Sequence, residues 1–453
     1  MNEYLCKFGG SSLSSAAQMR KVSNIIKSNH RRRYVVVSAP GKSHPDETKI
    51  TDLLIALASA ITNDFPSEDL ITQIADRYGK IADELALDTD YRELVKQDIL
   101  DRISKYSHSY VHLVDALKAS GEDNNAKLFA EHLRSIGLDA NYVSPHDVGL
   151  YLEKNKGVVR PLPEAYENIR EALLDRTDII VFPGFFGCTL EGEILTFTRG
   201  GSDISGSILA AALHVEKYEN FTDVDAVYSV RPDLVKNPMP IREMTYDEMR
   251  ELAYTGFNIL HEDALEPVRR QNIPLQIKSI DDPEGHGTYI VGKRMDFEGI
   301  MTGISGKKGF CVLHVEKYLM NQEVGFALDV LRIIAELNVP FEHMPTGIDS
   351  LSIIFREDVL TPDKERLLVT RILKELNVDA CYVTHELAII MAVGIAMKNA
   401  VGVLGRAVNA LSNAGINIEL VVQGPSEISI LFGIKDNLCN YAIRELYKSF
   451  FRN

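Results

Sequence analysis

The stretch EYLCKFGGSSLSSAAQMRKVSNIIKS, residues 3–28, joins a short apolar run to an amphipathic pattern through a lysine and two glycines. Residues 4–8 predict a strand, and apolar residues recur at helical spacing from Ser14 onward. A glycine pair lets backbone N–H groups approach a bound group, and a helix N-terminus adds positive potential. With Lys7 and two hydroxyls beside it, this junction predicts a phosphate pocket. The alternative is an ordinary turn with a surface lysine.

The rest of the composition limits the class of protein. A chain of 453 residues is too long for one compact core, so we expect about two to four domains. The net charge of −15 disfavours nucleic acid and anionic membranes as partners, and no apolar run approaches the ~20 residues that span a bilayer. The five cysteines form no CxxC pair. This argues against a disulfide framework and a structural zinc site, and predicts a cytoplasmic location.

Strands and helices alternate over roughly the first 290 residues, and glycines or acidic residues follow several strands. The stretches concerned are YVVVSAPG (34–41), DIIVFPGFFG (178–187), EILTFTRGGSDISGSILAAAL (193–213) and NFTDVDAVYSVRPDL (220–234). In open α/β sheets, ligands bind outside the carboxyl ends of the strands, so we expect these loops to converge on one site. The pattern predicts an open α/β sheet sandwiched by helices.

Two helical regions interrupt this alternation. Residues 52–117 are charged and helical in pattern, and they predict helical hairpins or a lid. In SGEDNNAKLFAEHLRSIG (120–137), Gly121 and Glu122 precede an amphipathic pattern, so we expect a helix to begin after them.

The residues at the predicted site favour phosphoryl transfer. One lysine and one arginine supply positive charge, and glycine-loop amides supply donors where charge grows in the transition state. The GKS at residues 41–43 would complete a P-loop, GxxxxGK[ST], only with a glycine at position 36, and that residue is Val36. The absence of a GxGxxG motif weakens the interpretation as a dinucleotide-linked dehydrogenase. Transfer from ATP to a small anionic acceptor is therefore the leading interpretation, with a phosphate-binding fold of no catalytic role next.

Three motifs in this order resemble aspartate kinases of the amino acid kinase family: KFGGSS (7–12), RGGSD (199–203) and FTDVD (221–225). The resemblance covers essentially the whole chain. It implies that the side-chain carboxylate of L-aspartate attacks the γ-phosphate of ATP, with Mg²⁺ as cofactor. The product would be 4-phospho-L-aspartate, in the first step of lysine, threonine and methionine biosynthesis. Because the attacking carboxylate is already ionised, no general base is needed.

The resemblance also implies roles for individual residues. Lys7 would bridge the acceptor carboxylate and the transferring phosphoryl group, and Asp203 would position that lysine. Arg199 would bind the substrate α-carboxylate and Glu122 its α-ammonium group. The other implied acceptor-site residues are Ser38, Thr51 and Ser202. The implied ATP contacts are Lys7, Gly9, Gly10, Ser11, Ser12, Gly200, Gly201, Thr222, Asp223, Tyr228, Asp233 and Asn258.

The sequence departs from the common family pattern at three places. Residues 123–125 are Asp-Asn-Asn where an arginine often follows the glutamate, residues 231–233 are Arg-Pro-Asp with the charges exchanged, and Asn258 replaces a frequent lysine. These changes affect nucleotide contacts and leave the four main residues unchanged. Purely structural alternatives also exist, since Thr51 could start a helix and Tyr228 could be a core aromatic residue.

The last third of the chain contains an internal duplication. Residues 323–355 align without gaps on residues 400–432, at an offset of 77. Each copy predicts a small βαββαβ sandwich. The pair resembles tandem ACT domains, which implies binding of a free amino acid and assembly into a homodimer or tetramer.

The predicted organisation is a catalytic domain over 1–295 and two ACT regions over 296–385 and 386–453, the second completed by a strand near 299–305. Lysine is the first choice of effector. The resemblance implies that it contacts Met320, Glu342 and Asp349, although Glu342 could equally be a solvated strand residue. The alternatives in function are another carboxylate kinase of the same fold and an inactive amino-acid-sensing regulator.

Overall fold

The structure is a computed structural model, and it describes residues 2–155, 157–197, 200–257, 260, 262–295, 297 and 299–451. These residues form two compact units. The first comprises residues 1–227, 240–250 and 258–295, and the second comprises 228–239, 251–257 and 296–453. Arg199 and Asn258, both expected at the site, lie outside the described residues. Over the described part of the chain, no helix has the length and apolar character to cross a membrane.

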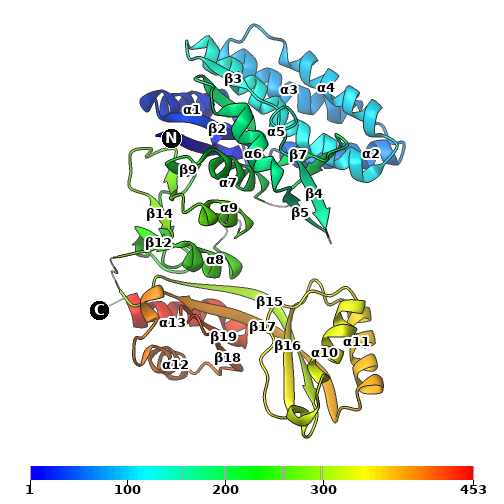
Figure 1. Ribbon diagram of the computed structural model, residues 1–453, viewed down its shortest axis with the longest axis vertical. Helices are drawn as coiled ribbons and strands as arrows, with labels where there is room; N and C mark the ends of the chain where they lie inside the picture. Colours follow the sequence, from blue (N-terminus) through cyan, green and yellow to red (C-terminus); the bar gives the residue numbers. More distant parts are fainter. Residues whose placement is uncertain are drawn as a thin grey trace. The chain divides into compact units, whose positions relative to one another are not determined.

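An eight-stranded sheet forms the centre of the first unit (Figure 1). β1 (Tyr4–Phe8) pairs in parallel with β2 (Arg32–Val37) and β9 (Lys217–Thr222). The largely apolar sequences of β1 and of the second half of β2 suit a sheet covered on both faces. Every described pairing in the sheet is parallel except β13 with β14. The order is β12 (Glu243–Thr245), β14 (Thr288–Val291), β13 (Leu275–Ser279), β9, β1, β2, β6 (Ile179–Pro183) and β3 (Ala140–Tyr142).

Helices cover both faces of this sheet, which confirms the predicted α/β class. α7 (Gly201–Leu213) packs on the face that carries Lys7, and α1 (Ala16–Ser28) packs on the face that carries Cys6 and Phe8. Four further helices gather beside α1 in one core (Figure 1), and they confirm the helical hairpins expected over 52–117. They are α2 (Ile50–Thr62), α3 (Glu68–Leu85), α4 (Tyr91–Tyr106) and α5 (Tyr110–Ser135).

The expected helix start after Gly121 and Glu122 is wrong, because α5 runs through both residues without a break. Glycine inside a helix costs about 1 kcal/mol relative to alanine. Here a Cβ atom would lie 3.0 Å from the Ala39 Cβ, and the Gly121 carbonyl accepts a hydrogen bond of 2.7 Å from the Tyr78 hydroxyl. Close packing against the end of β2 explains this glycine, and it fixes Glu122 on a long helix.

The sequence pattern predicted that the loop carrying RGGSD follows a strand of the main sheet, and this prediction is wrong. The loop follows β8 (Ile194–Thr196), which forms a separate hairpin with β7 (Phe186–Cys188). The shorter elements outside the sheet are β4 (Leu152–Asn155), β5 (Val158–Pro161), α6 (Glu164–Leu173), β10 (Val227–Tyr228), β11 (Pro240–Ile241), α8 (Tyr246–Tyr254) and α9 (Leu265–Arg270).

The second unit is an antiparallel sheet with helices, as expected of ACT regions. Its central strands, β15 (Gly303–Glu316) and β17 (Ala380–Val393), each span 14 residues. Figure 1 shows α12 and α13 beside one half of these strands and α10 and α11 beside the other half. The sheet order is β16 (Ser350–Arg356), β15, β17, β19 (Ser429–Lys435) and β18 (Leu420–Gln423).

The internal duplication is visible in the helices. α10 (Phe326–Glu336) and α12 (Val403–Asn413) begin and end 77 residues apart, and each follows a glycine with positive φ, 92° at Gly325 and 87° at Gly402. A side chain at either glycine would be strained. The helices α11 (Pro362–Glu375) and α13 (Cys439–Phe451) complete the two copies.

The two copies share their long strands. Residues 303–307 of β15 pair with residues 389–393 of β17, so a strand from upstream joins the sheet of the second copy. β17 also runs continuously through residue 386. In the first copy, the described segment after α10 forms no named strand and has isolated bridges at His343 and Thr346.

Candidate active site

Lys7 lies on β1 in the middle of the sheet and forms an ion pair with Asp203. The Lys7 Nζ is 2.5 Å from the Asp203 Oδ1, and the two side chains are 11% and 10% exposed. The same oxygen accepts a hydrogen bond of 2.9 Å from the Asn220 Nδ2, and Asn220 is the β9 partner of Lys7 in the sheet register. Residues far apart in the sequence therefore hold the lysine ammonium group in one place.

The glycine loop after β1 lies against the loop after β2. The Gly10 carbonyl accepts a hydrogen bond of 2.8 Å from the Gly41 N–H, and a Cβ atom at Gly10 would lie 2.9 Å from the Ala39 carbonyl oxygen. At Gly9, a Cβ atom would lie 3.8 Å from the Lys7 Nζ. Glycine is needed here because the two loops approach so closely.

A 3-10 turn, Gly10–Leu13, separates this loop from α1. Ser11 is exposed, whereas Ser12 is buried and its Oγ has no hydrogen-bond partner among the described residues. The N–H groups nearest to the glycine pair therefore belong to this 3-10 turn and not to the first turn of α1.

The N-terminus of α7 lies beside the loop after β6. A Cβ atom at Gly184 would lie 2.6 Å from the Ser202 Cβ, and Gly200 caps the helix with φ of 75°. Asp203 lies in the first turn of this 13-residue helix. Since the Gly184 N–H also donates to the Val37 carbonyl, the loops after β1, β2 and β6 and the positive end of α7 lie in one neighbourhood.

Glu122 faces the end of β2 from α5. It is 6% exposed, and its Oε2 has no hydrogen-bond partner among the described residues. Burial raises the pKa of this carboxyl to about 8, against the opposing effects of the Ala39 N–H and the Lys118 charge. One turn later, the Asn125 Nδ2 donates a hydrogen bond of 2.6 Å to the Ser38 carbonyl. α5 is therefore fastened to the strand end that carries the predicted acceptor residue Ser38.

The other predicted residues are distributed over both units. Thr51 is half-buried in the first turn of α2, and the Thr222 Oγ1 donates to the Asp223 Oδ1 at 3.1 Å after β9. Tyr228 and Asp233 belong to the second unit, where the exposed Asp233 forms an ion pair with Arg231 at 2.5 Å.

Asn125 and Asn220 were not among the site residues predicted from the sequence. Asn220 has a recognisable signal, since it and Glu219 are polar residues between Tyr218 and Phe221 in the buried interior of a strand. Asn125 has none in the sequence, because its partner Ser38 is 87 residues away.

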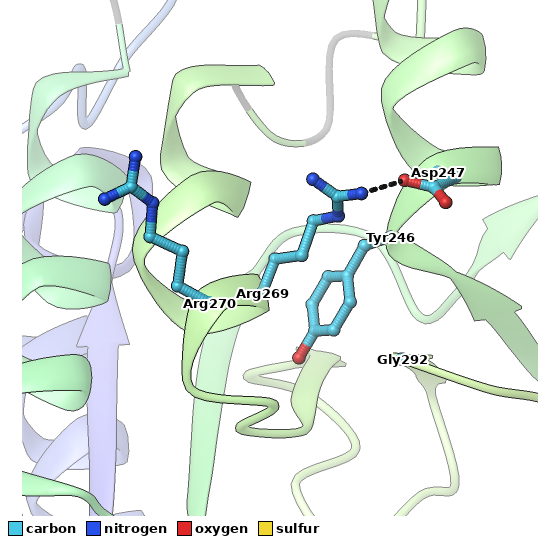
Figure 2. Close-up of a pocket in the computed structure, with 5 residues that line it drawn as sticks. All are labelled: Tyr246, Asp247, Arg269, Arg270 and Gly292. Atoms are coloured by element: carbon cyan, nitrogen blue, oxygen red, sulfur yellow. Dashed lines mark ion pairs between the residues drawn. The ribbon is translucent and has the colours of Figure 1, made fainter.

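A cavity of about 340 Å³ elsewhere in the first unit is lined by residues outside the predicted site: Tyr246, Asp247, Arg269, Arg270 and Gly292 (Figure 2). Its arginines are already paired. Arg269 lies 3.1 Å from Asp247, and Arg270 lies 2.5 Å from Glu266. Neither arginine of this cavity is therefore an unpaired cation that could bind a phosphate group.

Within the described residues, no group of three or more histidine, cysteine or acidic side chains could hold a metal ion. The five cysteines are free and buried.

The predicted effector residues all lie in the second unit. The Asp349 Oδ1 accepts a hydrogen bond of 2.9 Å from the Leu319 N–H, directly before Met320. The Glu342 Oε2 accepts one of 2.5 Å from the Tyr254 hydroxyl. Asp349 thus supports the loop of Met320, and Glu342 contacts the end of α8.

Comparison with known proteins agrees with this architecture. Residues 3–279 match the model of the amino acid kinase family, and residues 390–450 match an ACT domain. The chain therefore belongs to the amino acid kinase family, the class of phosphate-transferring enzymes that the sheet and its glycine loops define.

Within this family the chain is an aspartokinase. It is 46% identical to aspartokinase 3 of Bacillus subtilis over 98% of both chains. The aspartate kinase of Clostridium acetobutylicum, described as an allosteric enzyme, has a TM-score of 0.84 at 34% identity and covers 99% of this chain and 100% of its own. Escherichia coli aspartokinase III in complex with aspartate and ADP has a TM-score of 0.82 at 25% identity, with 99% of both chains covered. The alternatives of a different carboxylate kinase or an inactive regulator lose their support.

Proposed function

We propose that the Lys7–Asp203 pair at the N-terminus of α7 is where ATP phosphorylates the side-chain carboxylate of L-aspartate to 4-phospho-L-aspartate. The observation that carries this proposal is the buried ammonium group, fixed among the glycine loops at the carboxyl ends of β1, β2 and β6. We assign residues 1–295 to catalysis and 296–453 to regulation, with the division between the two ACT regions near residue 386. The free cysteines fit a cytoplasmic enzyme.

In this proposal, Lys7 neutralises charge that the acceptor carboxylate and the transferring phosphoryl group share. Asp203 holds the ammonium group in position, since it accepts from both Lys7 and Asn220. Backbone N–H groups beside the glycines and the positive end of α7 stabilise the negative charge of the transition state. Because the substrate carboxylate is ionised at neutral pH, attack requires no basic side chain.

The substrate's remaining groups are assigned to residues around this pair. Arg199 is proposed to bind the α-carboxylate through its bidentate guanidinium, and Glu122 to accept from the α-ammonium group. Ser38, Thr51 and Ser202 complete the acceptor site. The ATP contacts are proposed for Gly9, Gly10, Ser11, Ser12, Gly200, Gly201, Thr222, Asp223, Tyr228, Asp233 and Asn258.

Mg²⁺ is proposed to arrive with ATP and to be held mainly by phosphate oxygens and water, as this cation prefers. Asp203 lies beside the proposed phosphate position, because it pairs with Lys7, and this contact suits it to a supporting role. When bound, Mg²⁺ neutralises charge on the β- and γ-phosphates.

The affinity for aspartate is expected to rise with pH. Burial raises the pKa of Glu122 to about 8, so at pH 6.5 most molecules carry a protonated carboxyl that cannot pair with an ammonium group. The KM for aspartate should therefore fall as pH rises from 6.5 to 8.5. Steady-state kinetics on Glu122→Gln provide the check: this variant should have a higher KM with little pH dependence. An equally steep profile in the variant would rule out Glu122 as the titrating group.

The ACT regions are proposed to bind an inhibitory free amino acid, with lysine as the first candidate. The Glu342 carboxylate suits a cationic side chain, and Met320 and Asp349 border the loop before α10. Exposed apolar side chains in the same copy support assembly into a homodimer or a dimer of dimers: Tyr318 (74%), Val324 (101%), Leu328 (70%) and Ile348 (72%). Calorimetry with lysine, threonine and methionine tests the proposal, which fails if none of the three binds.

Substitutions of Glu342 and Tyr254 should change the half-inhibitory lysine concentration in opposite directions. Glu342→Gln removes the charge that pairs with the effector, so the half-inhibitory lysine concentration should rise about tenfold or more. Tyr254→Phe removes a hydrogen bond that competes for this carboxylate, so that concentration should fall. Inhibition curves at fixed aspartate and ATP measure both effects. Equal shifts in the same direction would contradict the role of Glu342.

A further inference from the structure

We infer that Asn125 is a second acceptor for the α-ammonium group of the substrate and helps to select an amino diacid over a plain diacid. This inference depends on the proposed role of Glu122. It adds a residue that neither the motifs nor the resemblance assigned.

The orientation of the Asn125 carboxamide is fixed by its partner. Its Nδ2 lies 2.6 Å from the Ser38 carbonyl oxygen, which can only accept a hydrogen bond. The Oδ1 therefore occupies the opposite side of the amide. Asn125 is fully buried, and its Oδ1 has no hydrogen-bond partner among the described residues.

Glu122 has the same unusual property one turn earlier on α5. Its Oε2 is buried without a partner among the described residues, and the Ala39 N–H acts on its carboxyl group to lower the pKa against the effect of burial. Residues three apart share one helix face, and both side chains reach consecutive residues at the end of β2. Two buried acceptors without donors thus lie on the same face of α5.

Buried polar atoms are nearly always paired, and a site with two unpaired acceptors is suited to a ligand with several N–H donors. An ammonium group carries three such donors and one positive charge. Glu122 supplies the opposite charge and Asn125 a neutral acceptor. A second carboxylate at position 125 would instead raise the pKa of Glu122 further, because like charges disfavour ionisation.

The test compares aspartate with succinate, which has the same two carboxylates but no amino group, on the full-length enzyme. Asn125→Leu keeps the approximate shape and removes both the donor and the acceptor. It should raise the KM for aspartate about ten- to a hundredfold, as expected for loss of a hydrogen bond to a charged group. The inhibition constant of succinate against aspartate should stay within about twofold or fall, and the KM for ATP should not change.

Asn124→Ala is the matched control. Asn124 is the neighbouring buried asparagine, and its Oδ1 also has no hydrogen-bond partner among the described residues. Its Nδ2, however, donates to Asp98 at 2.8 Å and to the Ser120 carbonyl, not to the end of β2. Asn124→Ala should leave the ratio of the aspartate KM to the succinate inhibition constant unchanged. Where Asn125→Leu does not fold, as judged by thermal unfolding, Asn125→Ala is measured instead.

An unchanged KM for aspartate would overturn the inference. So would an equal rise in the aspartate KM and the succinate inhibition constant, because that result indicates a role only in shaping the site through Ser38. Glu122→Gln separates the two levels of the proposal. If Glu122→Gln raises the KM for aspartate more than the inhibition constant of succinate and Asn125→Leu does not, only the role of Asn125 is wrong. If Glu122→Gln changes the two constants equally, the proposed ammonium site itself is wrong.

Discussion

Lys7→Met is expected to lower the kcat for aspartate phosphorylation by about three to five orders of magnitude. The ammonium group is the only part of Lys7 that can neutralise charge between donor and acceptor, and the methionine keeps much of the side-chain volume. Removing one partner of a buried pair also leaves the Asp203 carboxylate uncompensated, which lowers stability. Circular dichroism and urea unfolding should nevertheless show a folded protein, so that the lost activity is attributable to the charge.

Lys21→Met is the matched control for this experiment. Lys21 pairs with Asp281 on the surface, where the two side chains are 50% and 68% exposed. Exposed ion pairs contribute about 0–1 kcal/mol, so this variant should retain both its activity and its stability. Activity of Lys7→Met within about tenfold of the unmodified enzyme would remove Lys7 from the mechanism.

Glu219→Gln is expected to lower the free energy of unfolding by about 3–5 kcal/mol at pH 7. Glu219 lies on β9 and is 1% exposed, with its carboxylate 2.7 Å from the Arg32 Nε, 3.2 Å from the Lys217 Nζ and 3.6 Å from the Lys278 Nζ. An amide would leave three cations around a neutral group. Urea unfolding at fixed pH measures the loss.

The pH dependence of stability follows from the same cluster. Burial alone would raise the pKa of Glu219, but the hydrogen bond and charge of Arg32, with the charges of Lys217 and Lys278, lower it overall. A depressed pKa means that the stabilisation is present above the carboxyl's pKa in the unfolded chain and is lost as pH falls through its folded value.

The neighbouring Glu216→Gln is the control, because Glu216 pairs with Arg31 and is 46% exposed. This variant should change stability by less than about 1 kcal/mol. Similar losses in the two variants would show that the buried position of Glu219 is not the cause.

The strands and glycine loops of the first unit could be predicted because their signals are local. Residues 4–8 form β1 as expected, and the glycines that follow are required by the close approach of Ala39 and Gly41. The pairing of Lys7 with Asp203 was implied by the family resemblance, but no local sequence pattern indicates it. It depends on α7 lying over β1, which only the assembled sheet establishes.

The wrong predictions have a common physical cause, since tertiary packing overrides local preference. Gly121 resembles a helix boundary by propensity, yet contact with Ala39 makes it an interior residue of α5. β8 has an apolar sequence followed by glycines, like the strands of the main sheet, but it pairs with β7 in a separate hairpin. The internal duplication was predictable, whereas the sharing of β15 and β17 between the copies was not, because a repeat does not indicate where strands pair.

We propose that aspartate is phosphorylated on its side-chain carboxylate at the Lys7–Asp203 pair. The most direct measurement is trapping of the acyl phosphate with hydroxylamine in reactions that contain ATP, Mg²⁺ and aspartate, using the unmodified enzyme and Lys7→Met side by side. The unmodified enzyme should form aspartyl hydroxamate in step with ADP, and the variant should form almost none. ADP without hydroxamate, or the same yield from both proteins, would contradict it.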